Sequence, residues 1–239
     1  MQGKGTMGAL RKREFSMLDM IEIEPKSPAR SAVIWLHGLG ADGHDFEPLV
    51  KQWQLADELG ARFVLPHAPV QPVTLNGGMR MRAWYDIYDL GFDGEEDAEG
   101  IAQARQLLLG LIEREQQRGI SSQNILLAGF SQGGAVALHT ALRWDKPLAG
   151  VLVLSAYLPL RHSLAAEQRA DPGSLVVRMD HGEQDPVVPY RAALASRELL
   201  QAAGFDVEFN SYAMEHGLCP PQVNSLRDWL VQRLQATRV

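Results

Sequence analysis

The chain has 239 residues, the size of one large α/β domain, and its 46% hydrophobic and 22% charged residues exclude a disordered chain. Lys and Arg number 23 against 29 Asp and Glu, which leaves a net charge of −6. Because binding to phosphate groups requires a basic face, this balance argues against nucleic acid as the main partner.

The sequence shows no sign of a secretory or membrane-spanning segment. Residues 1–16 are basic but lack the apolar stretch of about 7–15 residues of a secretory signal. We expect a disordered N-terminal extension there and one domain over residues 17–239. No run approaches the ~18 apolar residues of a membrane span. The single cysteine, Cys219, cannot form an internal disulfide, so we expect a cytoplasmic protein.

Short apolar runs alternate with amphipathic stretches from residue 31 onwards. Continuous runs of this kind indicate strands that are buried on both faces. They are residues 32–36, 63–65, 125–128, 151–154 and 175–177. In contrast, Val207 and Phe209 alternate with polar residues, which indicates a half-exposed strand near the edge of the sheet.

Helices are predicted between these strands. Apolar residues between 101 and 112 share one helical face, and Gly119 is placed to end that helix. Two more helices are predicted over residues 132–143 and 190–203, and a last one begins at Pro220 and Pro221. Strands that alternate with such helices predict an α/β fold with a mostly parallel sheet covered on both faces, in a single domain.

Residues 129–133, Gly-Phe-Ser-Gln-Gly, match the pattern G-x-S-x-G directly after the strand predicted at 125–128. The pattern requires a sharp strand-to-helix turn that lifts the serine hydroxyl out of the sheet, and the two glycines leave room for it. The helix N-terminus also favours negative charge beside the serine. We predict Ser131 as a nucleophile; the alternative is a structural serine in a tight turn.

A nucleophilic serine needs a base to take its proton and an acid to orient that base. On this type of sheet the acid and then the histidine follow the serine along the chain. The only histidine after residue 185 is His216, in a turn before the last helix. Asp185 lies in the loop after the strand predicted at 175–177 and is the predicted acid; Glu183 is the alternative.

The reaction also needs hydrogen-bond donors for the oxyanion that develops on the substrate. The backbone N–H of Gln132, the residue after the nucleophile, is one predicted donor. The other is the N–H of Leu39, because residues 37–40 leave the strand predicted at 32–36 at the corresponding point. Loss of one such donor typically lowers turnover by about 10²–10³.

Residues 38–43 also match the dinucleotide-binding pattern G-x-G-x-x-G. Pro48 would interrupt a helix that began at this glycine turn. No strand ends in an acidic residue about 20 positions further on, where it would hold a ribose. These two features argue against a nucleotide site.

The remaining features favour structural interpretations. The other histidines show no paired metal-ligand spacing, so neither a metal nor a cofactor is predicted. Cys219 is more typical of a buried neutral cysteine than of a thiol nucleophile. Residues 75–85, rich in Met and aromatic side chains, line a substrate pocket or pack over the sheet, and the residues alone leave both open.

Several longer segments together resemble the carboxylesterase and acyl-protein thioesterase (lysophospholipase-like) family of the α/β-hydrolases. They are VIWLHGLGADGHDF (33–46), PHAPVQPVTLN (66–76), AWYDI (83–87), GFSQGGAVAL (129–138), HGEQDPVVP (181–189) and EHGLC (215–219). The resemblance implies an α/β-hydrolase fold over most of the chain. It also implies the same catalytic and oxyanion residues that the motifs predict.

The resemblance carries three further implications. It places Leu75 and Trp84 beside the site as substrate-binding residues. Because members of this family are often dimers, it favours a homodimer. Two segments depart from the family pattern, residues 77–82 and Tyr157, and both bear on which acyl chain is preferred.

We therefore predict a serine carboxylesterase that hydrolyses esters of short to medium acyl chains through an acyl-enzyme. The alternative within this class is an acyl-protein thioesterase or lysophospholipase acting on long-chain thioesters or esters. Two other classes stay open: an oxidoreductase that binds a nucleotide through residues 38–43, and a binding module with an inactive site.

Overall fold

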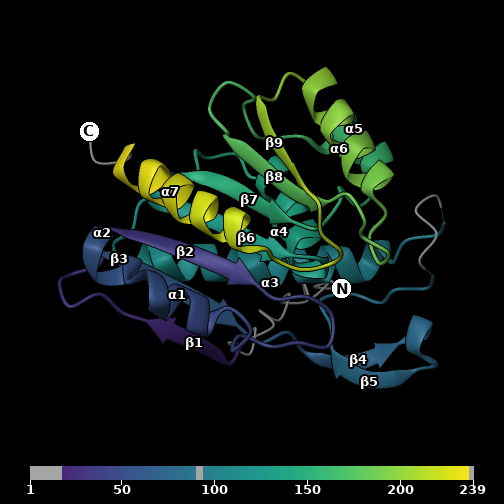
Figure 1. Cartoon of the computed structure of the whole chain (residues 1–239), viewed down its shortest axis with the longest axis horizontal. Helices are drawn as coiled ribbons and strands as arrows, with labels where there is room; N and C mark the ends of the chain where they lie inside the picture. Colours follow the sequence, from purple (N-terminus) through teal and green to yellow (C-terminus); the bar gives the residue numbers. More distant parts are fainter. Residues whose placement is uncertain (1–17, 90–93, 237–239) are drawn as a thin grey trace, which may run out of the picture.

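The computed structural model describes residues 18–89 and 94–236 (Figure 1). The disordered extension expected over residues 1–16 lies outside these residues. Seven strands form the central sheet in the order β1-β3-β2-β6-β7-β8-β9. Their bounds are β1 Met20–Ile23, β2 Ser31–Leu36, β3 Ala61–Pro66, β6 Ile125–Phe130, β7 Gly150–Leu154, β8 Val177–Gly182 and β9 Val207–Tyr212. β1 pairs antiparallel with β3, and the other neighbours pair parallel.

Helices cover both faces of this sheet. The longer ones are α3 Ala98–Gln117, α4 Gln132–Leu142, α6 Tyr190–Ala202 and α7 Pro220–Ala236; the shorter ones are α1 Glu47–Trp53, α2 Leu55–Leu59 and α5 Leu164–Glu167. Successive side chains of a strand point to opposite faces. Val33 and Trp35 therefore pack with α1, α2 and α7, whereas Ile34 and Leu36 pack with α3, α4 and α6. The predicted single α/β domain with helices on both faces is confirmed.

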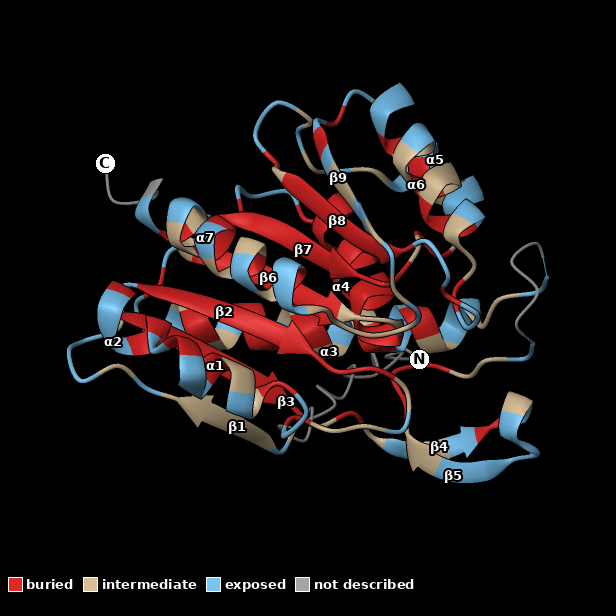
Figure 2. Cartoon of the chain, viewed as in Figure 1, coloured by how far each residue is buried: buried red, intermediate tan, exposed pale blue. Residues whose placement is uncertain are grey.

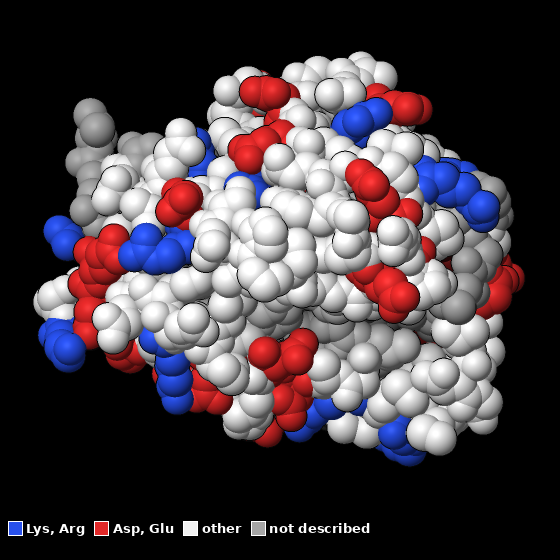
Figure 3. Space-filling view, in the orientation of Figure 1, with Lys and Arg blue, Asp and Glu red and all other residues white. Residues whose placement is uncertain are grey.

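Burial follows the predicted pattern of apolar runs. All residues of β2 and β3 are buried, and Figure 2 shows the central strands buried and the outer sides of the helices exposed. β9 is buried only in part and lies at one edge of the sheet, as its alternating pattern predicts. On the face in Figure 3, acidic and basic side chains are interspersed with uncharged surface. None of the helices in the described ranges has the length and apolarity needed to cross a membrane.

Some short elements differ from the sequence prediction. β8 begins at Val177, so Leu175 and Val176 precede it rather than start it. A two-stranded hairpin, β4 Val70–Val73 and β5 Met79–Arg82, projects from the body, and the sequence pattern predicts neither of its strands (Figure 1). Short 3-10 helices complete the chain: Thr74–Asn76, Ser122–Asn124 and Arg161–Ser163.

A group of six charged side chains, called here the Glu22 cluster, joins β1 and β3 to α3 and the residue that follows it. Its members are Glu22, Glu24, Arg62, Arg114, Glu115 and Arg118. Arg62 donates to the fully buried Glu115 at 2.7 Å and to Glu24 at 2.7 Å. Arg114 binds Glu22 through two hydrogen bonds, of 2.8 and 3.0 Å. This pairing with Arg114, assisted by Arg118, lowers the pKa of Glu22 to about 2. The cluster thus fastens the edge strand to the body.

Candidate active site

Ser131 lies in the turn between β6 and α4, at the carboxyl edge of the sheet. Its backbone has φ 53° and ψ −122°, a conformation that only tight turns impose on a residue with a side chain. A Cβ on Gly129 would lie 2.3 Å from the carbonyl oxygen of Gly133, and a Cβ on Gly133 would lie 2.5 Å from that of Leu36. Both positions therefore require glycine, as the G-x-S-x-G pattern predicts, and the turn exposes Ser131 to a pocket.

His216 and Asp185 meet in the loops that follow β9 and β8. His216 Nδ1 lies 2.7 Å from Asp185 Oδ2, while Asp185 Oδ1 accepts the N–H groups of Val187 and Val188 at 2.9 Å each. Burial by itself raises the pKa of Asp185, but the hydrogen bonds from His216 and the two amides lower it on balance. A carboxylate only accepts, so His216 Nδ1 carries the proton and Nε2 is left as an acceptor.

Glu183, the alternative acid, and the nearby Asp180 have other partners. Glu183 accepts a hydrogen bond from Ser211 Oγ at 2.8 Å on the exposed side of β9. Asp180 lies within β8, as expected, and is paired with Arg178 at 2.9 Å in the interior. Of these acids, Asp185 is the one that reaches His216.

Phe130 brings His216 next to the serine turn. Its ring lies 4.8 Å from the imidazole of His216, measured between centroids, and Ser131 is the next residue along the chain. Within the described residues no hydrogen bond joins Ser131 to His216. In enzymes without substrate this bond is often long and tightens only in the complex. The structure thus brings the three predicted residues to one edge of the sheet.

A second histidine, His181, lies beside Asp185 and was not singled out by the sequence. Its Nε2 is 2.8 Å from the carbonyl oxygen of Val188 and 3.4 Å from Asp185 Oδ2. Burial lowers the pKa of His181. The neutral ring therefore donates to the Val188 carbonyl and holds the loop that carries Asp185. The segment HGEQDPVVP contains both residues, but only the fold shows this contact.

Leu39 and Gln132 line the same pocket as Ser131, where their amides can serve one oxyanion. Trp84 connects the two segments. Its indole N–H donates to the carbonyl of His37 at 2.9 Å, and its backbone N–H donates to Gln132 Oε1 at 2.8 Å. The indole is 3% exposed and is not among the residues that line the pocket. The structure therefore places Trp84, expected in substrate binding, behind the oxyanion segments.

His37 holds the same loop from the other side. Its Nε2 accepts the N–H of Ala68 at 3.0 Å, so Nδ1 carries the proton and donates to the carbonyl of Gly38 at 2.7 Å. Burial lowers the pKa of His37 and keeps the ring neutral. These bonds hold the start of residues 38–43, the segment whose Leu39 lines the pocket. The helix that follows, α1, begins at Glu47 and has Pro48 in its first turn. It therefore does not begin at the glycine turn itself, where a dinucleotide-binding helix would begin.

A pocket of about 120 Å³ opens at Ser131. Its apolar wall includes Leu75, Ile87, Val187 and Val188, and the polar residues Tyr85, Glu96 and Tyr157 line it together with Ser131 and Gln132. Leu75 therefore lies where the resemblance places it. Tyr157, one of the two departures from the family pattern, lies in the same wall.

A second pocket of about 350 Å³ lies on the side of Phe130 and His216. It is lined by Phe46, Leu49, Phe130, Gly217, Leu218 and Val223, with Asp45 as its charged residue. Burial raises the pKa of Asp45. The serine turn is therefore flanked by two mostly apolar hollows.

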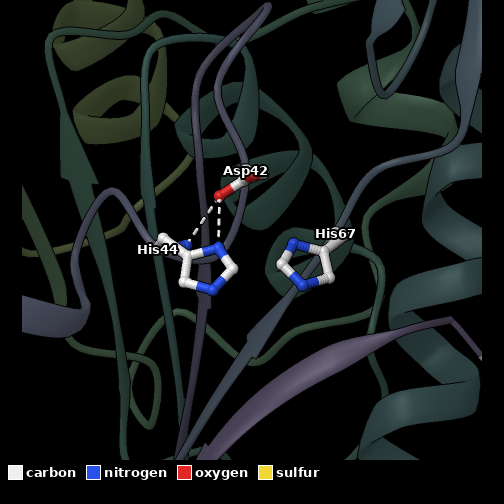
Figure 4. Close-up of side chains that lie close together, drawn as sticks. All are labelled: Asp42, His44 and His67. Carbon is white, nitrogen blue, oxygen red and sulfur yellow. Dashed lines mark hydrogen bonds and ion pairs between the residues drawn. The ribbon is translucent and has the colours of Figure 1, made fainter.

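Asp42, His44 and His67 come together at the loop after β2 (Figure 4), although their spacing in the sequence suggests no metal site. Asp42 Oδ1 already accepts the backbone N–H and Nδ1 of His44, at 2.8 and 3.0 Å. His67 Nδ1 accepts the N–H of Gly43 at 3.0 Å, which leaves the proton on Nε2. These bonds join the three side chains to the backbone of residues 43 and 44. We read the group as a support for the loop that carries Leu39.

Comparisons with known proteins find a matching family, similar relatives and similar solved structures. The family described as Phospholipase/Carboxylesterase matches residues 19–233. A curated relative from Neurospora crassa, named acyl-protein thioesterase 1, is 38% identical over 85% of this chain and 87% of its own. The crystal structure of Arabidopsis thaliana SOBER1 has a TM-score of 0.81 at 30% identity, covering 86% of this chain and 100% of that chain. Zea mays acyl-protein thioesterase 2 also has a TM-score of 0.81, at 28% identity over 90% and 99% of the two chains.

Proposed function

The chain belongs to the phospholipase/carboxylesterase family of α/β-hydrolases, and on this premise we propose that it cleaves acyl thioesters and carboxylic esters through an acyl-enzyme on Ser131. The observation that carries the proposal is the 2.7 Å hydrogen bond between His216 and Asp185, beside the serine turn. It fixes the tautomer in which His216 can accept the serine proton.

The proposed reaction uses residues of this chain alone. Ser131 Oγ attacks the acyl carbonyl carbon while His216 Nε2 takes its proton. The amides of Leu39 and Gln132 stabilise the oxyanion. Removal of one such donor typically lowers turnover by about 10²–10³. The tetrahedral intermediate collapses, His216 protonates the departing thiolate or alkoxide, and the acyl group stays on Ser131. Water, deprotonated by His216, then releases the acid and restores the serine.

Two candidate substrate classes follow, each from a specific observation. The relatives' name, acyl-protein thioesterase, favours thioesters over the carboxylesterase that we predicted first. The pocket favours short acyl chains, because about 120 Å³ is smaller than the ~150 Å³ cavity that accepts benzene. We propose thioesters as the first class and short-chain carboxylic esters as the second. A long acyl chain would have to extend out of the pocket.

A serine-directed fluorophosphonate and two acyl series test this proposal. The series are p-nitrophenyl esters and acyl-CoA thioesters, each from acetyl to palmitoyl. We expect labelling and turnover that disappear in Ser131→Ala and persist in Ser174→Ala, an exposed serine on a distant loop. Absence of labelling and of turnover in the wild type would favour a binding module. The ratio between the series, and the chain length at their maxima, decides between the two substrate classes.

Two further parts of the proposal concern the protein as a whole. The homodimer that the resemblance favours is tested by light scattering at several protein concentrations. The cytoplasmic location is tested by fractionation of the source cells. A single species with the mass of one chain at all concentrations would reject the dimer.

A further inference from the structure

We propose that the acyl pocket recognises a hydroxyl group near the reacting carbonyl of the acyl chain, and that Glu96 is the residue that binds it. This inference rests on the proposed hydrolase function and specifies its substrate class. Glu96 lies just before α3, and its side chain lines the pocket that contains Ser131.

One carboxyl oxygen of Glu96 has no partner in the described ranges 18–89 and 94–236. Oε2 accepts the N–H of Leu160 at 2.9 Å, whereas Oε1 is buried and meets no donor among the described residues. Nearly all buried polar atoms in folded proteins have a partner, and an unpaired one carries a desolvation cost. Glu96 thus lines the pocket and has a buried acceptor without a partner in the described structure, so a small shift of its side chain would let it bind a polar group of the substrate.

Two tyrosines extend the polar part of this wall. The hydroxyls of Tyr85 and Tyr157 lie 3.5 Å apart, and both residues line the pocket together with Glu96. Leu75, Ile87 and the valines of the Asp185 loop form the rest of the wall. A few convergent polar groups in an apolar pocket are the usual means of fixing a ligand's orientation.

The chemistry of the carboxyl selects a hydroxyl among the possible groups. Burial raises the pKa of Glu96, and the amide of Leu160 and the charges of His162 and Arg161 offset this only in part. A hydroxyl donates to the ionised carboxylate and accepts from the protonated acid, so it pairs with either form. A methylene does neither, and a second carboxylate would be repelled by the ionised form.

The size of the pocket limits how far the hydroxyl can be from the carbonyl. Its volume of about 120 Å³ is below the ~150 Å³ of a cavity that accepts benzene. A hydroxyl that reaches Glu96 while the carbonyl lies at Ser131 therefore sits within the first few carbons. The expected acyl groups are short hydroxyacyl groups such as 3-hydroxybutyryl and 4-hydroxybutyryl.

The alternative role of Glu96 is to anchor the loop at Leu160, whose φ of 49° is unusual for leucine. Three variants separate the roles. Glu96→Met removes both polar oxygens at similar length. Glu96→Gln keeps an acceptor for the Leu160 N–H and a polar group for the pocket. Glu95→Gln removes the same charge from the exposed neighbouring residue.

The test compares kcat/KM for p-nitrophenyl butyrate, 3-hydroxybutyrate and 4-hydroxybutyrate in the wild type and these variants. We expect the wild type to favour at least one hydroxyacyl ester about tenfold or more over butyrate. Glu96→Met should abolish this preference, because kcat/KM should fall far more for the favoured hydroxyacyl ester than for butyrate, whereas Glu96→Gln and Glu95→Gln should keep it.

Three results would overturn the inference. Equal kcat/KM for the three esters in the wild type does so without any variant, while leaving the proposed hydrolase function intact. Equal losses on all three esters in Glu96→Met would assign Glu96 to anchoring the loop. If no ester is cleaved and no fluorophosphonate label appears, the proposed function itself has failed and this inference fails with it.

Discussion

The Glu22 cluster and the acyl pocket both take carboxyl groups out of water, and they do so in opposite ways. In the Glu22 cluster three glutamates face three arginines, and pairing with Arg114 lowers the pKa of Glu22. In the pocket, burial raises the pKa of Glu96, whose Oε1 has no donor in the part of the chain that the structure describes. Asp185 is intermediate, because its bonds to His216 and two amides outweigh its burial.

Whether a buried carboxyl group is fully paired thus distinguishes regions that stabilise the fold from regions that can bind a ligand. Where the charged groups are paired with one another, as between β1 and α3, they are already satisfied and are poor candidates for binding another molecule. Where a buried polar group keeps free capacity, the fold carries a local cost that a ligand can relieve. Perturbed groups that gather in one hollow are therefore better candidates for function than charge density itself.

Asp185→Asn, at the carboxylate that is paired with His216, is expected to have the largest effect on activity. An amide there stabilises the wrong tautomer of His216, so kcat should fall by about 10⁴. The melting temperature should change little, because an amide can still accept from Val187 and Val188. Glu183→Gln is the matched control and should leave kcat unchanged. Nearly wild-type kcat in Asp185→Asn would transfer the role of the acid to another residue.

A smaller effect, on stability instead of activity, is expected when the Glu22 cluster is broken. Arg62→Met removes the guanidinium that lies 2.7 Å from the fully buried Glu115. Because Arg114 and Arg118 still contact Glu115, we expect a loss of about 2–3 kcal/mol, near the lower limit for a broken buried pair.

Urea unfolding measures this loss, with Lys26→Met in the exposed Lys26–Asp57 pair as the control that should not change. Activity of the folded Arg62→Met protein at 25 °C should equal that of the wild type. A fall in kcat as large as the fall in stability would contradict the separation of the two regions.

The smallest effect is a contrast in pH dependence. The pKa of Glu22 is lower in the folded state, so its contribution to stability is present above about pH 4.5 and is lost towards pH 2. The pKa of Glu96 is raised, so folding favours its protonated form, and stability is lost as the pH rises above about 4.5.

Urea unfolding between pH 3 and pH 7 should therefore give opposite results for two matched variants. Relative to the wild type, Glu22→Gln should lose more stability at pH 7 than at pH 3. Glu96→Gln should compare more favourably at pH 7 than at pH 3. Curves that shift in the same direction would show that the two carboxyls are in equivalent surroundings.

Much of the fold could be predicted from the sequence, because the buried parallel strands are continuous apolar runs. The hairpin β4–β5 could not, since its strands are short and half of their residues are exposed, and Pro72 interrupts the pattern of β4. β1 was missed for a similar reason: it has four half-buried residues at the antiparallel edge.

In the candidate site, too, some residues could be predicted from short stretches of sequence and others could not. Ser131, Asp185 and His216 follow from motifs and chain order, which short stretches of sequence contain. The support by Trp84 could not be predicted, because its contact with Gln132 joins residues 48 positions apart. Glu96 could not be predicted either, because its contact with Leu160 joins residues 64 positions apart and its place in the pocket leaves no local signal.

The backbone of Ser131 has a consequence for how this protein can change. A positive φ costs a residue with a side chain of order 1–3 kcal/mol, and glycine would relieve most of it. Selection for stability alone would therefore replace Ser131 with glycine. The protein gives up some of its thermal tolerance to keep a hydroxyl at this turn. At this position a substitution that raises the melting temperature therefore also removes the hydroxyl on which the proposed activity depends.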